Sequence, residues 1–359
     1  MIYREVGQFK ASYAADQAIF PIRQDRWLMI AALAAAYLVV PMVGSEYWLL
    51  TIMVPFLVYG LAALGLNLLT GYAGQLSLGT GGFMAVGAFA TYKLTTAFPW
   101  LDIVAVFLIA GLITAAVGVL FGLPSLRIKG LYLAVATLAS QFFLIWLFNK
   151  FPWFNNYSPS GVISAPPRAV FGIANITGAE ASPVAKYLFT LTFVGILALA
   201  AKNLVRGRFG RSWMAIRDMD IAAEIIGIRP LRTKLLAFAV SSFYCGIAGA
   251  MWAFIYTGGV EALAFDIDRS FQILFMIIIG GLGSILGSFL GAGFIVLLPI
   301  FLDNAPRLFG LGIPVNTVTN LQSMIFGALI IFFLIVEPRG LARLWQIGKE
   351  KLRMWPFPY

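Results

Sequence analysis

Long apolar runs separated by short charged segments limit this chain more than any other feature of its sequence. Apolar residues make up 61% of its 359 residues and charged residues only 11%, whereas soluble domains carry about 25% charged residues. One membrane-spanning helix needs about 20 mostly apolar residues. These runs exclude a soluble globular fold and predict an all-α, polytopic transmembrane bundle of about eight to ten spans.

Nine apolar stretches carry the predicted spans. One of them, 270–302, has 33 residues without a charge, and Gly280, Gly281, Gly283 and Gly287 interrupt it. It is too long for one ordinary helix, so we expect two short helices or a re-entrant hairpin there. The other predicted spans are 27–43, 47–69, 73–98, 103–123, 131–149, 186–201, 235–257 and 320–336.

The distribution of charge predicts the orientation, because Lys and Arg accumulate in short cytoplasmic loops. With the N-terminus inside, the cytoplasmic segments carry 19 of the 25 basic and 8 of the 15 acidic residues, a net charge of +11, against −1 elsewhere. Only an even number of crossings within 270–302 keeps the basic C-terminus inside. The expected organisation is a cytoplasmic segment 1–26, a transmembrane domain 27–336 with inner loops 124–130 and 202–234 and an outer loop 150–185, and a cytoplasmic tail 337–359.

Several classes of function are excluded by residues that the chain lacks. It has no His and a single Cys, Cys245, so His-ligated metal sites, disulfides and Ser-His-Asp triads are absent. The glycine-rich stretch 71–87 lacks the Lys-Ser/Thr ending of a phosphate-binding loop. Without an acidic residue inside the predicted spans, a proton-driven carrier is disfavoured. We expect no metal, nucleotide or nucleic acid to bind, and membrane lipid to contact the basic segments.

The basic loop 202–234 carries the signals of one short helix near its middle. Asp220 is expected to cap the start of this helix. Gly227 suits the left-handed position after its last turn, with an apolar contact from Ile228, and Pro230 blocks continuation.

The surface of this short helix allows two interpretations. Ile221 and Ile225 offer an apolar knob on an otherwise solvated loop, and Ala222 and Ala223 permit close approach by another surface. A docking helix for a partner protein fits this composition. An amphipathic helix on the lipid surface, attracted by the basic flanks, fits it equally well.

Two glycine-interrupted segments, 71–87 and 280–293, suggest an internal repeat of broken helices. In transporters such breaks lie where backbone groups and helix ends contact the solute. Close packing of helices through small residues is the other interpretation. The candidate residues of a solute path are Asn67, Gly74, Gln75, Ser77, Gly79, Thr80, Phe83, Gly280, Gly281, Gly283 and Ser284.

Five stretches, in order along most of the chain, resemble the permeases of ABC importers of the branched-chain amino acid type. Ala222–Gly227 is similar to the coupling-loop motif of these permeases. The other matching stretches are Leu66–Gly79, Arg127–Leu138, Gly280–Ser284 and Glu337–Leu341. The resemblance implies a coupling helix seated in an ATP-binding subunit and so favours docking over the lipid surface. The residues that it implies for coupling are Arg217, Asp218, Asp220, Ala222, Ala223, Glu224 and Gly227.

The resemblance also implies partners and a cargo. A second homologous permease subunit, two ATP-binding subunits that hold ATP and Mg²⁺, and a periplasmic or extracellular substrate-binding protein would complete an importer in the bacterial inner membrane. This chain itself would then be neither an enzyme nor a holder of any cofactor.

Leucine, isoleucine and valine are the expected solutes. The chain departs from the family pattern at Thr80, where His is usual, and at Tyr157–Gly161, where a more glycine-rich run is common. Other hydrophobic amino acids, urea or related amides, aromatic acids, and a stand-alone secondary carrier therefore stay as alternatives.

Overall fold

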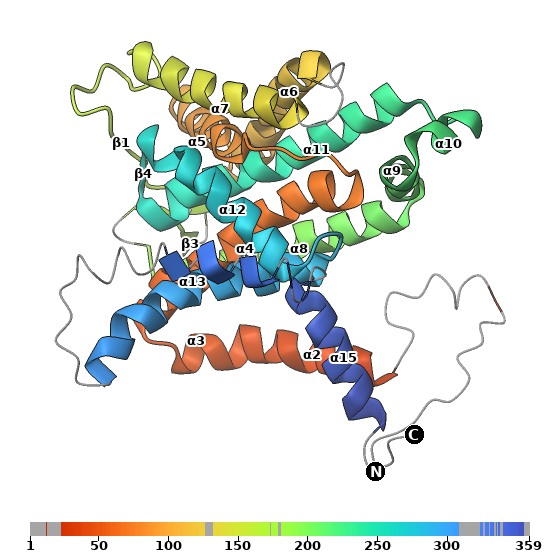
Figure 1. The fold of residues 1–359 in the computed structure, drawn as a ribbon. Helices are drawn as coiled ribbons and strands as arrows, with labels where there is room; N and C mark the ends of the chain where they lie inside the picture. The colour runs from red at the N-terminus through yellow and green to blue at the C-terminus, as the bar shows by residue number, and fades with distance from the viewer. Residues whose placement is uncertain are drawn as a thin grey trace.

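The structure is a computed structural model that describes most of the chain. The described residues form a bundle of helices (Figure 1), and seven helices in this part of the chain are long and apolar enough to cross a membrane. The expected all-α polytopic fold is therefore confirmed. The described residues are 12, 23–125, 132–172, 174–178, 181–308, 324–325, 327–329, 331–333, 335, 337 and 340–354.

Most predicted spans correspond to observed helices. The first comprises α2 (Arg23–Ala34), η1 (Ala35–Val39) and α3 (Val40–Val43), and the second comprises η2 (Trp48–Met53), α4 (Val54–Asn67) and the π-helical turn η3 (Leu68–Tyr72). The next single helices are α6 (Ile103–Ser125), α7 (Tyr132–Lys150) and α8 (Pro183–Arg206), and α11 (Pro230–Met251) continues into η4 (Trp252–Thr257).

Two helices extend beyond the spans that the sequence predicts. Helix α8 runs past 201 to Arg206, and α11 begins at Pro230 rather than near 235. Lys and Arg are good helix formers, so a charge ends an apolar run without ending the helix. The glycine after Arg206 and the proline at the first turn of α11 set the real limits. Within the predicted span 320–336, the described residues 324–325, 327–329, 331–333 and 335 are helical, and the other eight lie outside the described residues.

Both predicted breaks are present. The span expected over 73–98 is a non-helical stretch, 74–79, followed by α5 (Thr80–Ala97). Within 270–302, Gly281–Ser284 separates α12 (Ile267–Gly280) from α13 (Ile285–Leu308). At Gly281 and Gly283 φ is 117° and 74°, values that favour glycine. The expectation of two helices is confirmed, but α13 is not short, because its first 18 residues alone meet the length of a span.

Helix α11 lies at the centre of the bundle, against α4, α5 and α6 (Figure 1). Its glycines allow this close packing. A Cβ added to Gly249 would collide with the backbone of Met84 in α5, and one added to Gly87 of α5 would collide with the backbone of Gly246. Small residues at such crossings let helix backbones approach closely.

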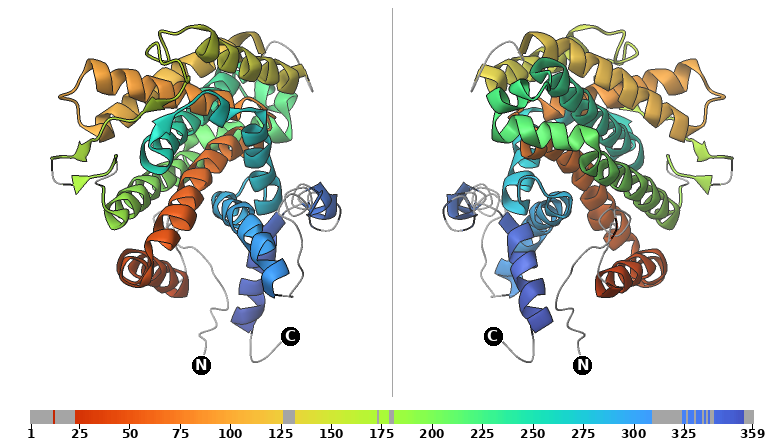
Figure 2. Two further views of the ribbon diagram at one scale, coloured as in Figure 1. Left: turned by 90° about the vertical axis from the view of Figure 1, so that its left-hand side faces the viewer. Right: turned by 90° about the vertical axis from the view of Figure 1, so that its right-hand side faces the viewer.

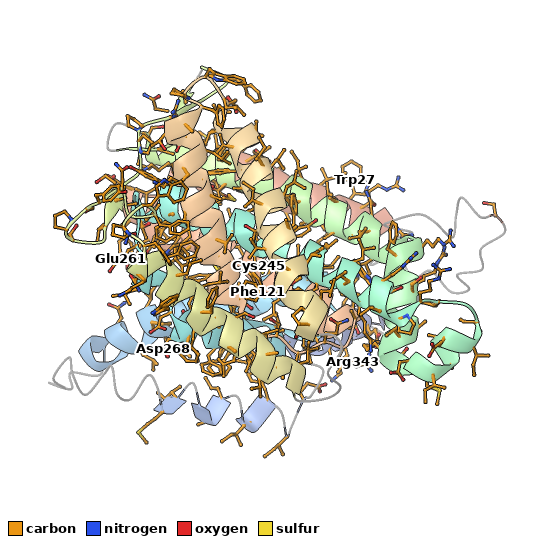
Figure 3. The ribbon with its side chains drawn as sticks, turned by 90° about the horizontal axis from the view of Figure 1, so that it is seen from above. Trp27, Phe121, Cys245, Glu261, Asp268 and Arg343 are labelled. Atoms are coloured by element: carbon orange, nitrogen blue, oxygen red, sulfur yellow. The ribbon has the colours of Figure 1, made fainter. Side chains whose placement is uncertain are left out.

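The two ends of the bundle differ. At one end lie α9 (Arg208–Asp218) and α10 (Asp220–Ile225), and at the other two short antiparallel ladders form (Figures 1 and 2). Seen from above, Glu261 and Asp268 lie near the ladder end and Arg343 of α15 (Gly340–Met354) toward the opposite end (Figure 3). The ladders pair β1 (Ile163–Ser164) with β4 (Gly259–Val260) and β2 (Ala169–Val170) with β3 (Ala174–Asn175), and η5 (Leu263–Phe265) follows β4.

The central crossing can be tested with one methyl group. Gly249→Ala is expected to destabilise the protein by about 1–3 kcal/mol, because backbone atoms of α5 must shift to admit the Cβ. The midpoint of thermal unfolding in detergent measures the loss. Gly195→Ala in α8 is the matched control, since a Cβ there meets nothing within 4 Å. An unchanged midpoint in Gly249→Ala would contradict the packing.

Candidate coupling and translocation site

Helix α9 is fixed to the bundle by one buried face. Gly210, Trp213 and Ile216 recur at a spacing of three residues and are buried. The Trp213 side chain is 1% exposed, and its Nε1–H donates to the carbonyl of Thr233 in α11 at 3.1 Å. The basic segment predicted as a loop with one helix therefore contains two helices, and the first is anchored between α8 and α11.

The end of helix α10 agrees with the prediction from the sequence, but its start does not. The N–H of Gly227 donates to the carbonyl of Glu224 at 2.9 Å, that of Ile228 donates to Ala223 at 3.0 Å, and φ of Gly227 is 89°. These bonds form a Schellman ending. The predicted Asp220 cap is wrong, because Met219 occupies the cap position and makes no side-chain cap bond. Asp220 is instead 3.9 Å from the Lys234 ammonium.

The outward face of α10 is an apolar knob, formed by Met219, Ile221, Ile225 and Ile226. These side chains are 71–81% exposed. Ala222 and Glu224 are exposed beside them. Ala223 is only 2% exposed, so the expectation that it forms part of a docking surface was wrong: it packs against its own chain.

Arg217, at the end of α9, connects this part of the protein to the first helix break. Its Nε–H donates to Asp218 Oδ1 at 2.9 Å, and its Nη1–H donates to the carbonyl of Gly71 at 2.9 Å. Its aliphatic stem packs on Gly74, where an added Cβ would lie 2.8 Å from Arg217 Cγ. Arg217 thus supplies a hydrogen-bond donor to the carbonyl of Gly71, which lies in the π-helical turn η3.

Asn67 joins the first break to the second. Its Nδ2 donates to the carbonyl of Ser284 at 2.9 Å and to Ser288 Oγ at 2.8 Å, and its Oδ1 accepts from the N–H of Gly283 at 2.9 Å. The side chain is fully buried. Gly71 lacks a Cβ where one would collide with Gly283. The two breaks are therefore in direct contact.

The non-helical stretch 74–79 runs beside α7 toward the start of α5. Its residues alternate: Gln75 and Ser77 face inward, and Gly74 and Leu76 are exposed. The N–H of Leu78 donates to Thr137 Oγ1 of α7 at 2.9 Å. Two further bonds tie the stretch to η3: the N–H of Gln75 donates to the carbonyl of Leu69, and Thr70 Oγ1 donates to the carbonyl of Gln75, both at 3.1 Å.

The first N–H groups of α5 are also satisfied by other helices. Gly81 donates to Ser270 Oγ of α12 at 2.8 Å, and Gly82 donates to Gln141 Oε1 of α7. Gln141 Nε2 in turn donates to the carbonyl of Phe265 at 2.7 Å. Sequence reasoning missed Thr137, Gln141 and Ser270. Their signal was their polarity within apolar runs, where a polar side chain usually has a specific partner.

The predicted path residues are therefore brought together, but mostly inside the subunit. The side chains of Gln75, Ser77, Thr80 and Phe83 are at most 3% exposed. The side-chain amide of Gln75 is buried, and neither its nitrogen nor its oxygen has a hydrogen-bond partner among the described residues. The assignment of these residues to a solute path stays a prediction. Buried with them are Gly79, Gly280 and Gly281, whereas Gly283 and Ser284 are half-buried and Gly74 is exposed.

The sequence of the chain is similar to permeases of known transport systems. Residues 48–334 match the family model described as the branched-chain amino acid transport system permease component. The chain is 30% identical over 304 residues to the high-affinity branched-chain amino acid transport system permease protein LivM of Salmonella typhimurium, covering 79% of this chain and 68% of that protein. The Escherichia coli protein of that name gives the same figures.

A more distant relative comes from an archaeon. The probable branched-chain amino acid transport permease protein LivM of Methanocaldococcus jannaschii is 28% identical over 239 residues, covering 65% of this chain and 66% of that protein. No solved structure matches the chain significantly.

Asn67→Leu tests the contact between the breaks. The variant keeps a side chain of similar size but leaves the N–H of Gly283 and the carbonyl of Ser284 without this partner. We expect a loss of at least about 2 kcal/mol in stability, with faster hydrogen exchange at Gly283. Asn304→Leu is the control, because its Nδ2 donates only within α13 at an exposed position. Equal exchange at Gly283 in wild type and Asn67→Leu would contradict the role of Asn67.

Proposed function

Because this chain belongs to the family of branched-chain amino acid transport system permease components, we propose that it is the membrane subunit of an ATP-driven importer. The cargo is a branched-chain or related hydrophobic amino acid. The chain hydrolyses no ATP itself. Two partner ATP-binding subunits hold ATP and Mg²⁺, a second homologous permease completes the membrane part, and a substrate-binding protein delivers the solute.

The observation that supports this proposal best is the apolar knob of α10. Ile221 and Ile225 are 74% and 81% exposed at the end of the bundle that carries α9. Exposed apolar side chains on a short, firmly ended helix favour a protein partner. Because α9 is anchored by Trp213 and Arg217, force applied to the knob reaches the bundle rather than bending a flexible loop.

The proposed orientation places this end in the cytoplasm. The basic loop 202–234 carries eight Lys and Arg against three acidic residues, and α15 carries four against one. Positive charge remains on the cytoplasmic side. Both termini are then cytoplasmic, and the ladder end with β1 and β4 faces the periplasm of a bacterial inner membrane. The substrate-binding protein docks at that face.

Arg217 and Asn67 give a mechanism for the coupling. Closure of the ATP-binding subunits displaces α10, and Arg217 carries this displacement to the carbonyl of Gly71. Asn67 carries it onward to Gly283, so the two breaks move together. Nucleotide binding thereby shifts the population between inward-facing and outward-facing states, with ATP binding as the driving term. Coupling roles for Asp218, Asp220 and Glu224 are part of the same proposal.

Charge placed on the knob tests docking. Ile225→Asp is expected to reduce co-purification of the ATP-binding subunits by about tenfold, because a carboxylate is buried against an apolar partner surface. Glu224→Arg is expected to act in the same direction. The control is Leu344→Asp, which changes a 47% exposed apolar residue on α15. Unchanged co-purification in both α10 variants would contradict docking at this helix.

Reconstitution in liposomes separates the importer from a stand-alone carrier. The assembled complex with its binding protein should take up radiolabelled leucine only with ATP, and the purified chain alone should move nothing. Uptake by the lone chain down an ion gradient would overturn the ATP-driven function. Competition by isoleucine, valine, urea and aromatic acids then identifies the solute class.

A further inference from the structure

We propose that a cavity around Arg269 binds the phosphate group of an anionic membrane lipid. The cavity has a volume of about 330 Å³ and lies between η2–α4, η4, α12 and α13. It is separate from the contact between the helix breaks and from the knob of α10. Its lining combines apolar side chains, among them Met276, Ile295 and Ile300, with the guanidinium of Arg269.

The guanidinium of Arg269 is held in a fixed position by two aromatic rings. Its Cζ lies 4.6 Å from the ring centre of Trp252 and 5.3 Å from that of Tyr59, and these two rings are 4.7 Å apart. Both rings also line the cavity. Cation–π contacts of this kind stabilise a charge that has lost water, but they do not neutralise it.

Arg269 keeps donors for a ligand. Its Nε–H donates to the carbonyl of Ala264 and its Nη1–H to Gln272 Oε1, both at 3.3 Å. A guanidinium has five N–H donors, so three remain. No carboxylate forms an ion pair with Arg269 in the part of the chain that the structure describes. A half-buried cation with donors left over is a site for an oxyanion, and the planar fork of Arg fits phosphate with two bonds.

The chemistry of the lining favours a lipid over a transported amino acid. A free amino acid also carries an ammonium group, and no Asp or Glu lines the cavity. A lipid carries a negatively charged phosphate attached to apolar acyl chains. This combination matches a cavity in which the Arg269 guanidinium lies beside apolar side chains. Exposed apolar residues of α13 next to the cavity, Leu297 and Phe301 at 48% and 63% exposed, offer contacts for acyl chains.

The position of the cavity agrees with a headgroup. Asp268, the residue before Arg269, lies near the same end of the bundle as Glu261 (Figure 3). Thr51, near the start of the second span, and Pro299, late in α13, also line the cavity. Arg269 therefore lies toward the ladder end of the bundle, where phosphates of one lipid leaflet would be within reach of its side chain.

Lipid retention in the purified transporter tests this proposal. The complex is purified in mild detergent with dioleoyl phosphatidylglycerol, and retained lipid is counted by native mass spectrometry. Arg269→Gln is expected to lower retention at least about tenfold, the effect of losing charge-assisted bonds. Lys186→Gln, a basic residue at the ladder end of α8 outside the cavity, is the control and should retain lipid as wild type does. Equal retention in wild type and Arg269→Gln would overturn the proposal.

Measurements on the wild-type complex keep the test independent of how the variant folds. Dioleoyl phosphatidylcholine, which adds a cationic group, should be retained less than phosphatidylglycerol. Excess leucine or inorganic phosphate should displace none of the bound lipid. Displacement by leucine would assign the cavity to a solute carboxylate, displacement by inorganic phosphate would assign it to a free anion, and equal retention of the two lipids would remove the selectivity. Each of these three results would overturn the lipid site.

Discussion

A helix that breaks inside a protein leaves backbone groups that need new partners, and Asn67 meets this requirement for the second break. A buried backbone N–H or C=O without a hydrogen bond costs free energy. One amide side chain supplies a donor to Ser284 and an acceptor to the N–H of Gly283. The interruption in α12–α13 therefore depends on the end of α4, although more than 200 residues separate them in sequence.

The same requirement explains how the knob of α10 can be coupled to the interior. The π-helical turn after α4 leaves the carbonyl of Gly71 available, and Arg217 donates to it. Trp213 fixes the other side of α9 on α11, and α11 itself packs tightly on α5 through Gly249 and Gly246. Few flexible elements lie between the exposed isoleucines and the two breaks, so a displacement at one end has a short path to the other.

The sequence predicted what depends on local composition. Apolar runs predicted the spans. Gly227 and Pro230 predicted the end of α10, because a glycine in the left-handed conformation and a proline without an N–H end a helix within a few residues of their own positions. Asp220 failed as a cap because Asp is also a common helical first-turn residue, and its carboxylate lies near Lys234 instead. The prediction that Ala223 lies on the outer surface of α10 failed because a six-residue helix has too few apolar positions to define its buried face.

Contacts between distant segments were not predictable from one sequence. Nothing near Arg217 indicates that its partner is the carbonyl of Gly71, and Gln141 is a single amide whose contacts with Gly82 and Phe265 depend on how α5, α7 and η5 assemble. The glycine-interrupted segments 71–87 and 280–293 correctly predicted where the two breaks lie. That the breaks touch each other is a property of the tertiary fold alone.

Transport stoichiometry in an Arg217→Met variant tests the coupling most directly. In the complete reconstituted complex, leucine uptake and ATP hydrolysis are measured in the same liposomes. If Arg217 transmits motion from α10 to the breaks, ATP hydrolysis persists while the number of leucine molecules taken up per ATP falls severalfold. An unchanged ratio of uptake to hydrolysis in this variant would contradict the link between the coupling helix and the broken helices.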